Sequence, residues 1–296
     1  MNVAARKRVR PCLQSVLQVG ASYWPGSRDD GLHGYRVDRK GFASWQTTNA
    51  QPPSPADVTI WPLDLEIDDI KATRWFDRLT EDERARASRF VRREHQRRFV
   101  ACRYQLRQIL GQLCGIPGSE LCFRYGTHGK PEILGDPRLH FSVAHSNGVG
   151  VVATCTVVSV GIDLEVSASH EESACRVLTQ KELAIFRNYP GDKAELFLQY
   201  WTGKEAFLKL WGVGLSLEPS TIEIDWTDPP ICRPLGTQPP WVKSAWLSRI
   251  AGLAGTICTI ACSVPPLCTI NRVHSSSEDN ANCRPPAKRR GRRTAG

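Results

Sequence analysis

Two carboxylates stand at the end of an apolar segment, residues 160–165, whose sequence is VGIDLE. In a β-strand, residues i and i+2 project from the same face, so Asp163 and Glu165 are expected side by side with Leu164 behind them. Adjacent carboxylates repel each other, and Mg²⁺ is commonly held by one or two carboxylates together with substrate phosphates. Taken alone, the pair is equally compatible with solvated acids at an exposed strand end.

A second reactive stretch is the segment 201–209, whose sequence is WTGKEAFLK. On a helix, Trp201, Glu205, Leu208 and Lys209 fall near one face, because i, i+4 and i+7 neighbours align. A glutamate among aromatic and apolar side chains can have its proton affinity tuned for work as a base, and Lys209 could meet phosphate oxygens. The alternative is an ordinary amphipathic helix with an i,i+4 ion pair of Glu205 and Lys209.

The third feature is a concentration of positive charge. Arginine, lysine and histidine side chains are suited to binding phosphate, because they form charge-assisted hydrogen bonds. The candidate residues of these types are Arg84, Arg86, Arg89, Arg92, Arg93, Arg97, Arg98, Arg103, Arg107, Lys130 and His145. Most of the nine arginines must lie on the surface, because one helix cannot direct nine side chains the same way. A lone histidine such as His145 is also common as a core or loop residue.

Helices and strands in alternation are expected to position these residues. The β-branched run 57–61 predicts the first strand. Thr80 and Glu83 match a capping box and predict one long helix through Leu113, and Thr179 and Glu182 predict a second helical region that ends at Gly212. Further strands are predicted at 139–144, 149–156, 158–166, 221–224 and 256–264.

The same order of elements occurs twice, so the sequence predicts an α+β fold built as a pseudo-twofold tandem of two similar α/β subdomains. The expected division is a poorly ordered N-terminal extension (1–55), a first half (56–152), a second half with the metal site (153–266) and a disordered basic tail (267–296). The N-terminus weakly resembles a transit peptide, but an untargeted extension is expected.

Composition narrows the classes of protein. The 296 residues carry a formal net charge of +9. Residues 1–55 hold 8 basic and 3 acidic side chains and residues 270–296 hold 7 and 2, which leaves a net charge of −1 between them. This near-neutral central part disfavours a nucleic-acid-binding core. Eleven cysteines without a CxxC pair argue against a zinc site or a disulfide framework, and no apolar stretch is long enough for a membrane span. We therefore expect a cytoplasmic protein.

From about residue 57 to 265 the chain resembles the 4′-phosphopantetheinyl transferase superfamily, of the surfactin-synthetase-activating type. The resemblance rests on four segments, GKP at 129–131, FSVAHS at 141–146, VGIDLE at 160–165 and W-x-x-KEA-x-x-K at 201–209. The last two segments, about forty residues apart, form a specific pair.

The resemblance implies the phosphopantetheinyl transferase fold and an enzyme that moves phosphopantetheine from coenzyme A to a serine of an apo acyl or peptidyl carrier protein, with release of 3′,5′-ADP. By motif position, Asp163, Glu165 and Glu205 are the expected Mg²⁺ ligands. Glu205 is also the expected base, and Lys209 a pyrophosphate contact with a catalytic role. Lys204 matches the family lysine, but it could be structural.

The nucleotide end of coenzyme A is expected near Arg86, Lys130, Ala144 and His145, with Arg86 and His145 close to the 3′-phosphate. Ala144 departs from the family pattern, which has serine there, and Glu83 stands where relatives often carry lysine.

Two other functions remain open from the sequence. One is a Mg²⁺-dependent pyrophosphohydrolase acting on nucleotides or coenzyme A without a protein acceptor. The other is a nucleic-acid-binding protein with a basic tail and an inactive core. Two halves in one chain also predict a monomer that forms a pseudo-dimer by itself, with no membrane partner.

Overall fold

The computed structural model describes residues 55–271, except for 137, 167–170 and 254. Its strands are β1 (Ala56–Asp64), β2 (Phe123–Tyr125), β3 (Pro131–Ile133), β4 (His140–Ser146), β5 (Val149–Cys155), β6 (Val160–Val166), β7 (Ile222–Asp225), β8 (Ile231–Pro234), β9 (Ala245–Arg249), β10 (Thr256–Cys262) and β11 (Pro266–Ile270). Its α-helices are α1 (Asp69–Phe76), α2 (Glu81–Ala87), α3 (Arg93–Cys114), α4 (Glu171–Val177), α5 (Gln180–Arg187) and α6 (Lys193–Trp211).

Two larger sheets organise these elements. One has the strand order β11-β1-β5-β4, in which β1 and β11 are parallel and the other pairs are antiparallel. The other has the order β6-β10-β9-β8-β7 and is antiparallel. Strands β2 and β3 form a separate hairpin. The architecture is α+β, as predicted from the sequence.

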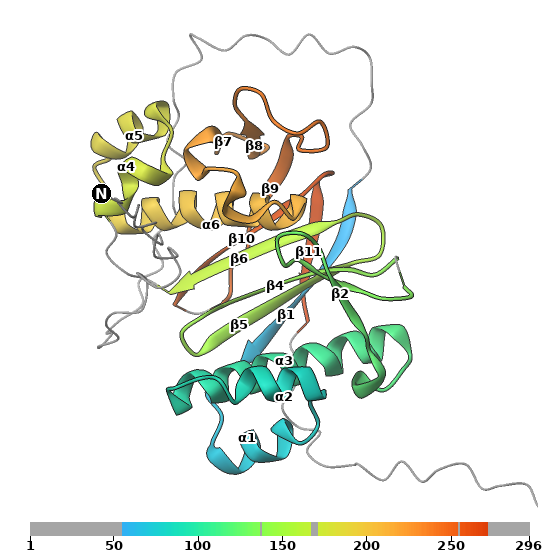
Figure 1. The fold of residues 1–296 in the computed structure, drawn as a ribbon. Coiled ribbons are helices and arrows are strands. Elements are labelled where there is room, and N and C mark those ends of the chain that lie inside the picture. Colours follow the sequence, from blue (N-terminus) through green and yellow to red (C-terminus); the bar gives the residue numbers. More distant parts are fainter. Residues whose placement is uncertain (1–54, 137, 167–170, 254, 272–296) are drawn as a thin grey trace, which may run out of the picture.

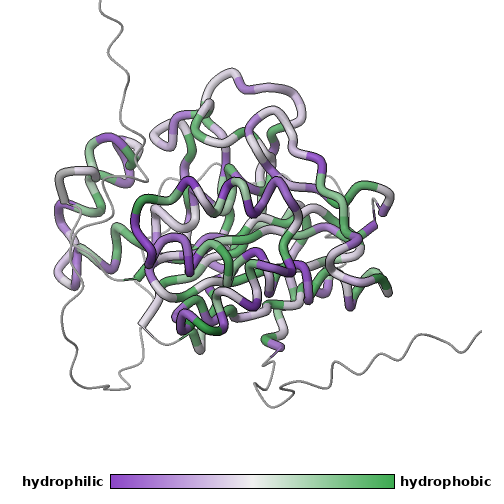
Figure 2. The backbone as a smooth tube through the Cα atoms, turned by 60° about the horizontal axis from the view of Figure 1, so that its bottom comes forward, coloured by the Kyte–Doolittle hydropathy of each residue, from purple (hydrophilic) through white to green (hydrophobic). Residues whose placement is uncertain are grey.

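The sheets and helices stack in four layers (Figure 1). Helices α1 to α3 cover the outer face of the four-stranded sheet, where Leu106 and Leu110 of α3 share a core with Leu63 and Phe141. The inner faces of the two sheets form a second core, and α4 to α6 cover the five-stranded sheet through a third. Figure 2 shows the corresponding hydropathy, with hydrophobic stretches of the backbone in the interior of the stack.

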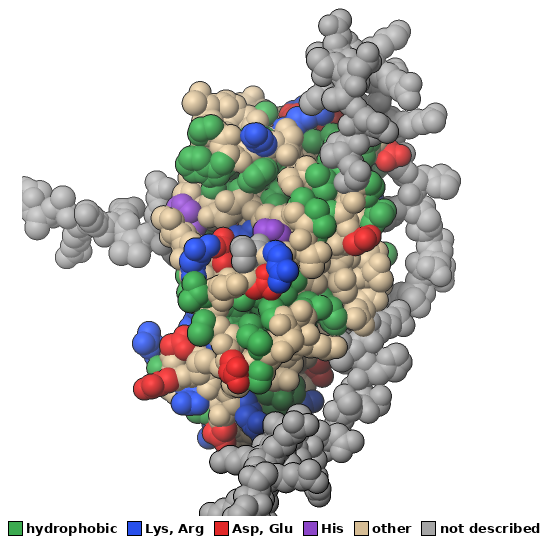
Figure 3. Space-filling view, turned by 90° about the vertical axis from the view of Figure 1, so that its right-hand side faces the viewer, with side chains coloured by type: hydrophobic (Ala, Val, Ile, Leu, Met, Phe, Trp, Pro, Cys, Tyr) green, Lys and Arg blue, Asp and Glu red, His purple; other side chains and the backbone are tan. Residues whose placement is uncertain are grey.

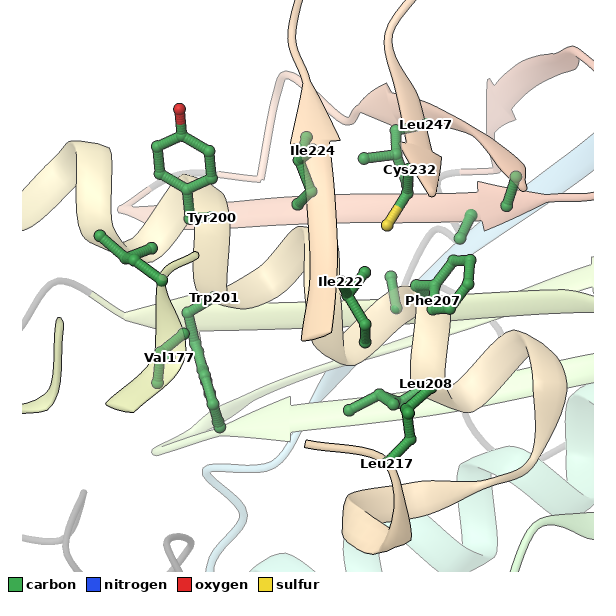
Figure 4. Packing of buried hydrophobic residues seen from close by; sticks show 14 of the residues in the cluster. Val177, Tyr200, Trp201, Phe207, Leu208, Leu217, Ile222, Ile224, Cys232 and Leu247 are labelled. Carbon is green, nitrogen blue, oxygen red and sulfur yellow. The ribbon is translucent and has the colours of Figure 1, made fainter. Parts of the chain in front are cut away.

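Helix α6, which carries the segment 201–209, is buried over most of its length. Trp201, Phe207 and Leu208 are all nearly inaccessible and pack among Ile222 and other residues of the third core (Figure 4). A helix that is apolar on most of its circumference belongs in the interior of a protein. The polar residues that α6 nevertheless carries therefore need specific partners.

The edge strands β4 and β6 join the two sheets through serine side chains. The Oγ of Ser142 accepts a hydrogen bond from Ile162 N at 3.1 Å, and the Oγ of Ser146 accepts one from Val166 N at 3.3 Å. Edge strands present unpaired N–H groups that must find partners when buried. The two hydroxyl groups satisfy this requirement across the junction of the sheets.

Gly161 allows α6 to lie directly against β6. A Cβ atom at this position would come within 2.0 Å of Ala206 O and 2.3 Å of Leu210 N, both of which belong to the backbone of α6. Gly161, Asp163 and Glu165 share one face of β6, because they are separated by two residues. The close approach at Gly161 therefore brings this face, with its carboxylates, against α6.

The two halves contain similar buried ion pairs. In the first half, the Glu83 carboxylate of α2 accepts hydrogen bonds from Arg103 at 2.6 Å and Arg107 at 2.7 Å, both from α3. In the second half, Glu182 of α5 accepts one from Lys204 of α6 at 2.5 Å. Each glutamate is the N3 residue of a capping box, as the sequence predicted. These pairs attach each short helix to the long helix of its half.

The structure corrects the predicted continuity of the first helix. The segment 80–113 forms two helices, because residues 88–92 separate α2 from α3 and Arg92 is extended at the α3 N-cap. Gln96 Nε2 donates to Ala87 O, which satisfies a carbonyl at the end of α2. Phe90 lies in this connection and is 36% exposed. The second helical region is likewise divided into α5 and α6.

The predicted boundaries also differ in part from the observed elements. The expected tail from residue 267 overlaps β11, which pairs with β1 and so belongs to the four-stranded sheet. The boundary expected between residues 152 and 153 falls inside β5. Residues 1–54 and 272–296 of the predicted extensions lie outside the described residues. Within the described part, no helix is long and apolar enough to cross a membrane, and the nine cysteines are free thiols.

Replacement of Gly161 by alanine should destabilise the protein, because the added methyl group meets helix backbone rather than a flexible side chain. Overpacking of this kind costs about 1–3 kcal/mol, measurable as a lower free energy of unfolding in urea. Gly126→Ala is the matched control, since its Cβ would meet only Lys130 O at 3.7 Å. Equal effects of the two substitutions would contradict the proposed role of Gly161.

Removal of the Glu182 carboxylate should have a larger effect on stability. Glu182→Ala leaves the fully buried Lys204 ammonium without its counter-charge, and breaking a buried pair in this way costs about 3–5 kcal/mol. Glu223→Ala, which removes the partner of the exposed Lys181, is the comparison and should cost about 0–1 kcal/mol. Thermal and urea unfolding of both variants would test the difference.

Candidate active site

The close contact between β6 and α6 produces an ion pair at the predicted site. Lys209 Nζ of α6 lies 2.6 Å from Asp163 Oδ1 of β6. The Asp163 side chain is 8% exposed and that of Lys209 is 28% exposed. Burial raises the pKa of Asp163, and the positive charge of Lys209 offsets part of this rise. Desolvation would lower the pKa of Lys209, but its carboxylate neighbours, Asp163 above all, raise it.

Glu165 and Glu205 belong to the same cluster of charges. Desolvation and the nearby charge of Asp163 raise the pKa of each of them to about 7, and Lys209 counteracts this rise in both. The negative charge of Glu165 also raises the pKa of Glu205. The structure therefore brings together Asp163, Glu165, Glu205 and Lys209, the four charged residues singled out in the two sequence segments.

Ser146 holds one oxygen of Glu165. Its hydroxyl donates to Glu165 Oε2 at 2.6 Å while it accepts from Val166 N. This bond favours the charged form of Glu165 and opposes the effect of burial on its pKa. Ser146 belongs to the segment 141–146, but no role was predicted for it from the sequence. The signal that could have identified it is its place next to His145 at the end of a strand.

Positive side chains gather around His145, at the exposed end of β4. Desolvation lowers the pKa of His145, and the charges of Lys209, Arg86 and Arg98 lower it further. Arg86 is exposed on α2 with its guanidinium group 5.2 Å from the Phe99 ring centroid. The charges of Arg86 and Lys209 therefore both act on His145. Positive side chains beside a histidine suit a site for an anionic ligand.

In the sequence, Arg98 is distinguished by nothing but its place among the nine arginines between residues 84 and 107. In the structure it pairs with Glu66 at 2.6 Å and with Glu94 at 2.5 Å. The Glu66 side chain in turn lies against Gly148, where a Cβ would meet Glu66 Oε1 at 2.3 Å. Arg98 thus connects α3 to the β4–β5 turn beside His145.

Lys130 does not direct its ammonium group into this cluster. Its Nζ donates to Leu210 O at 2.8 Å, Ser159 Oγ at 2.9 Å and Val160 O at 3.2 Å. Burial lowers its pKa to about 8. Because an ammonium group has three protons, these contacts use its whole donor capacity. The predicted contact of Lys130 with coenzyme A disagrees with this arrangement, in which Lys130 connects the ends of α6 and β6.

Ala144 and Lys204 also face the interior. Ala144 is 3% exposed and packs between the two sheets, so its methyl group is directed away from the charged cluster. Lys204 is fully buried and donates to Val177 O, Pro219 O and Glu182. These contacts are those of a structural lysine, which is one of the two roles considered for Lys204.

The donor chemistry of the cluster fits a divalent cation. Carboxylate oxygens are the ligands that Mg²⁺ prefers, and Asp163 Oδ2 is buried without a hydrogen-bond partner. Within the described residues, however, no three Asp, Glu, His or Cys side chains form a ready-made metal group. Asp163 and Glu205 therefore have the right chemistry to hold Mg²⁺ together with phosphate oxygens, as an open site rather than a closed cage.

Comparison with known proteins identifies the class of enzyme. Residues 159–261 match the family model of the 4′-phosphopantetheinyl transferase superfamily. The 4′-phosphopantetheinyl transferase HetI of Nostoc is 38% identical over 62% of this chain and 80% of its own length. A putative 4′-phosphopantetheinyl transferase of Synechocystis is 35% identical over 47% of this chain and 58% of its own length. A third relative, the 4′-phosphopantetheinyl transferase psf-1 of Bacillus pumilus, is 30% identical over 54% of this chain and 71% of its own length.

The chain therefore belongs to the 4′-phosphopantetheinyl transferase superfamily and is an enzyme of this transferase class. Among solved structures, the holo-[acyl-carrier-protein] synthase of Thermotoga maritima matches 36% of this chain and 64% of its own, with 22% identity and a TM-score of 0.30. A TM-score of this size supports no comparison of detail.

The raised pKa of Glu205 predicts a pH-dependent change in stability. Since the folded-state pKa of about 7 exceeds the ordinary 4.5, the free energy of unfolding should fall as pH rises from about 4.5 through 7. Glu205→Gln removes this loss, so the variant should match the wild type near pH 4.5 and exceed it above pH 7. A difference of about 1 kcal/mol would raise the Tm by about 2–4 °C.

Thermal unfolding in the presence of a chelator, from pH 5 to 8.5, measures this effect. Glu120→Gln, at an exposed position, should give the same difference from the wild type at every pH. A pH-independent difference for Glu205→Gln as well would show that Glu205 keeps an ordinary pKa.

Proposed function

We propose that the protein transfers the 4′-phosphopantetheine group of coenzyme A to a serine of an apo acyl or peptidyl carrier protein, in a Mg²⁺-dependent reaction that releases 3′,5′-ADP. The observation that carries the proposal is the meeting of Asp163, Glu205 and Lys209 where α6 lies against β6. These residues come from the two motifs that are specific for the family.

Phosphate groups of coenzyme A are the ligands for the positive residues of the site. Lys209 binds the pyrophosphate, and Arg86 and His145 lie beside the 3′-phosphate end of the nucleotide. Charge-assisted hydrogen bonds to phosphate are the strongest that such side chains make. Asp163, Glu205 and Glu165 would hold a Mg²⁺ ion, which would supply positive charge to neutralise the phosphate groups.

Glu205 is the base. Its carboxylate accepts the proton of the attacking hydroxyl group, which is general base catalysis. The serine Oγ forms a bond to the phosphorus that carries pantetheine, and the bond from this phosphorus to the leaving 3′,5′-ADP oxygen breaks. The serine proton passes to Glu205, and Lys209 stabilises the negative charge of the leaving group.

The two alternatives differ in their products and in their surfaces. A pyrophosphohydrolase would release 3′,5′-ADP from coenzyme A without a carrier protein. A nucleic-acid-binding protein would need a continuous basic surface. On the face shown in Figure 3, Lys and Arg side chains are interspersed with Asp and Glu, which favours an enzyme over a binder of nucleic acid. The predictions of a monomer in the cytoplasm remain predictions.

The proposal predicts loss of transfer in two conservative variants. Asp163→Asn and Glu205→Gln should each lower the rate of phosphopantetheine addition to an apo-carrier protein by about 100-fold or more, because removal of a positioned base alone costs about 10²–10⁴-fold. The measurement is the mass of the carrier after incubation with coenzyme A and Mg²⁺.

Glu120→Gln, at an exposed position outside the four sequence segments, should transfer at the wild-type rate. Release of 3′,5′-ADP is followed with and without the carrier. If 3′,5′-ADP is released at the same rate without the carrier, the activity is pyrophosphohydrolysis and not transfer. If Glu205→Gln transfers at the wild-type rate, Glu205 is not the base.

A further inference from the structure

The contact of Lys209 with Asp163 places a cation on the carboxylate group that a metal ion would also use. Lys209 Nζ lies 2.6 Å from Asp163 Oδ1, and Asp163 Oδ2 is buried with no hydrogen-bond partner. The Asp163 carboxylate thus has one oxygen neutralised by an internal cation and one oxygen available. An ammonium group and a divalent cation on the same carboxylate repel each other, and the repulsion is strong where water is excluded.

Lys209 has room to leave this position. Its side chain is 28% exposed, against 8% for Asp163, and a lysine side chain is a flexible four-carbon stem with a rotatable ammonium group. Its charge also acts on His145, together with those of Arg86 and Arg98. Lys209 therefore contacts Asp163 directly and is near enough to His145 for its charge to act there.

An anion near His145 would attract Lys209 away from the carboxylates. On the opposite side, the positive charge of Arg86 disfavours such a movement until an anion is present. Phosphate groups next to His145 would change this balance, because they neutralise Arg86 and offer Lys209 new acceptors.

We propose that Lys209 is an internal competitor of the divalent cation at Asp163, and that the phosphates of coenzyme A release it, so that the two ligands promote each other's binding. This inference rests on the proposed function, because it takes the Mg²⁺ site and the coenzyme A site from it. It adds a property that the function does not require: Lys209 itself weakens metal binding to the protein alone, and its departure strengthens that binding.

The coupling is measurable without turnover. Titration of the full-length protein with Mn²⁺, followed by electron paramagnetic resonance at one pH, gives the Kd of the metal with and without coenzyme A. In the wild type, coenzyme A should lower this Kd by at least about fivefold, a typical size for coupling between sites. Asp163→Asn should abolish the high-affinity binding, which assigns the Mn²⁺ to this site.

Lys209→Met should bind Mn²⁺ at least about fivefold more tightly than the wild type when coenzyme A is absent, and coenzyme A should then lower the Kd by a smaller factor than in the wild type. Lys243→Met removes one positive charge at an exposed position and should leave both Kd values unchanged. Because Lys209→Met leaves the buried Asp163 without its counter-charge, Mn²⁺ should also raise the Tm of this variant more than that of the wild type.

The outcomes separate the inference from the proposed function. If Asp163-dependent binding of Mn²⁺ occurs but Lys209→Met binds no more tightly than the wild type, competition by Lys209 is excluded and the proposed function stands. If coenzyme A leaves the wild-type Kd unchanged, the release of Lys209 is excluded in the same way. If neither protein binds Mn²⁺ in a manner that depends on Asp163, the metal site of the proposed function fails as well.

Discussion

The site depends on the close approach of one helix to one strand. At Gly161 the backbone of α6 lies where a side chain would otherwise stand, and this contact sets the separation between the carboxylates of β6 and the charged residues of α6. Asp163 and Lys209 reach hydrogen-bonding distance because their backbones are this near. A larger residue at Gly161 would move the helix as a unit, since tightly packed interiors transmit displacement rather than absorb it.

Burial gives the cluster its chemical character and imposes a cost. Apolar surroundings around α6 raise the proton affinity of Glu165 and Glu205, which suits a base that works near neutral pH. The same surroundings make several like charges unfavourable in the folded protein. Lys209 relieves part of this cost through Asp163, and Ser146 relieves another part through Glu165. The charged groups of the cluster are thus held in place by contacts that also offset the cost of burying them.

The sequence predicted the elements near the site well, because each has a strong local signal. Capping boxes at Thr80 and Thr179 begin helices where expected, and the apolar run 160–166 forms β6. Less of the surrounding structure could be predicted from the sequence. The break between α2 and α3 and the return of β11 to the first sheet depend on contacts between distant segments. No local pattern in residues 80–113 or 266–270 records those contacts.

The residue types at the site and their spacing were determined by the sequence alone, since the i,i+2 alternation of a strand and the i,i+4 neighbours of a helix follow from local geometry. The surroundings of three lysines, in contrast, were decided only by tertiary contacts. Lys130 and Lys204 find their partners in the interior, carbonyl oxygens for both and the Glu182 carboxylate for Lys204. Lys209 instead reaches a carboxylate at the boundary with solvent. The physical reason is that a lysine's partners come from segments far away in the chain, so its surroundings exist only once the sheets and helices have packed.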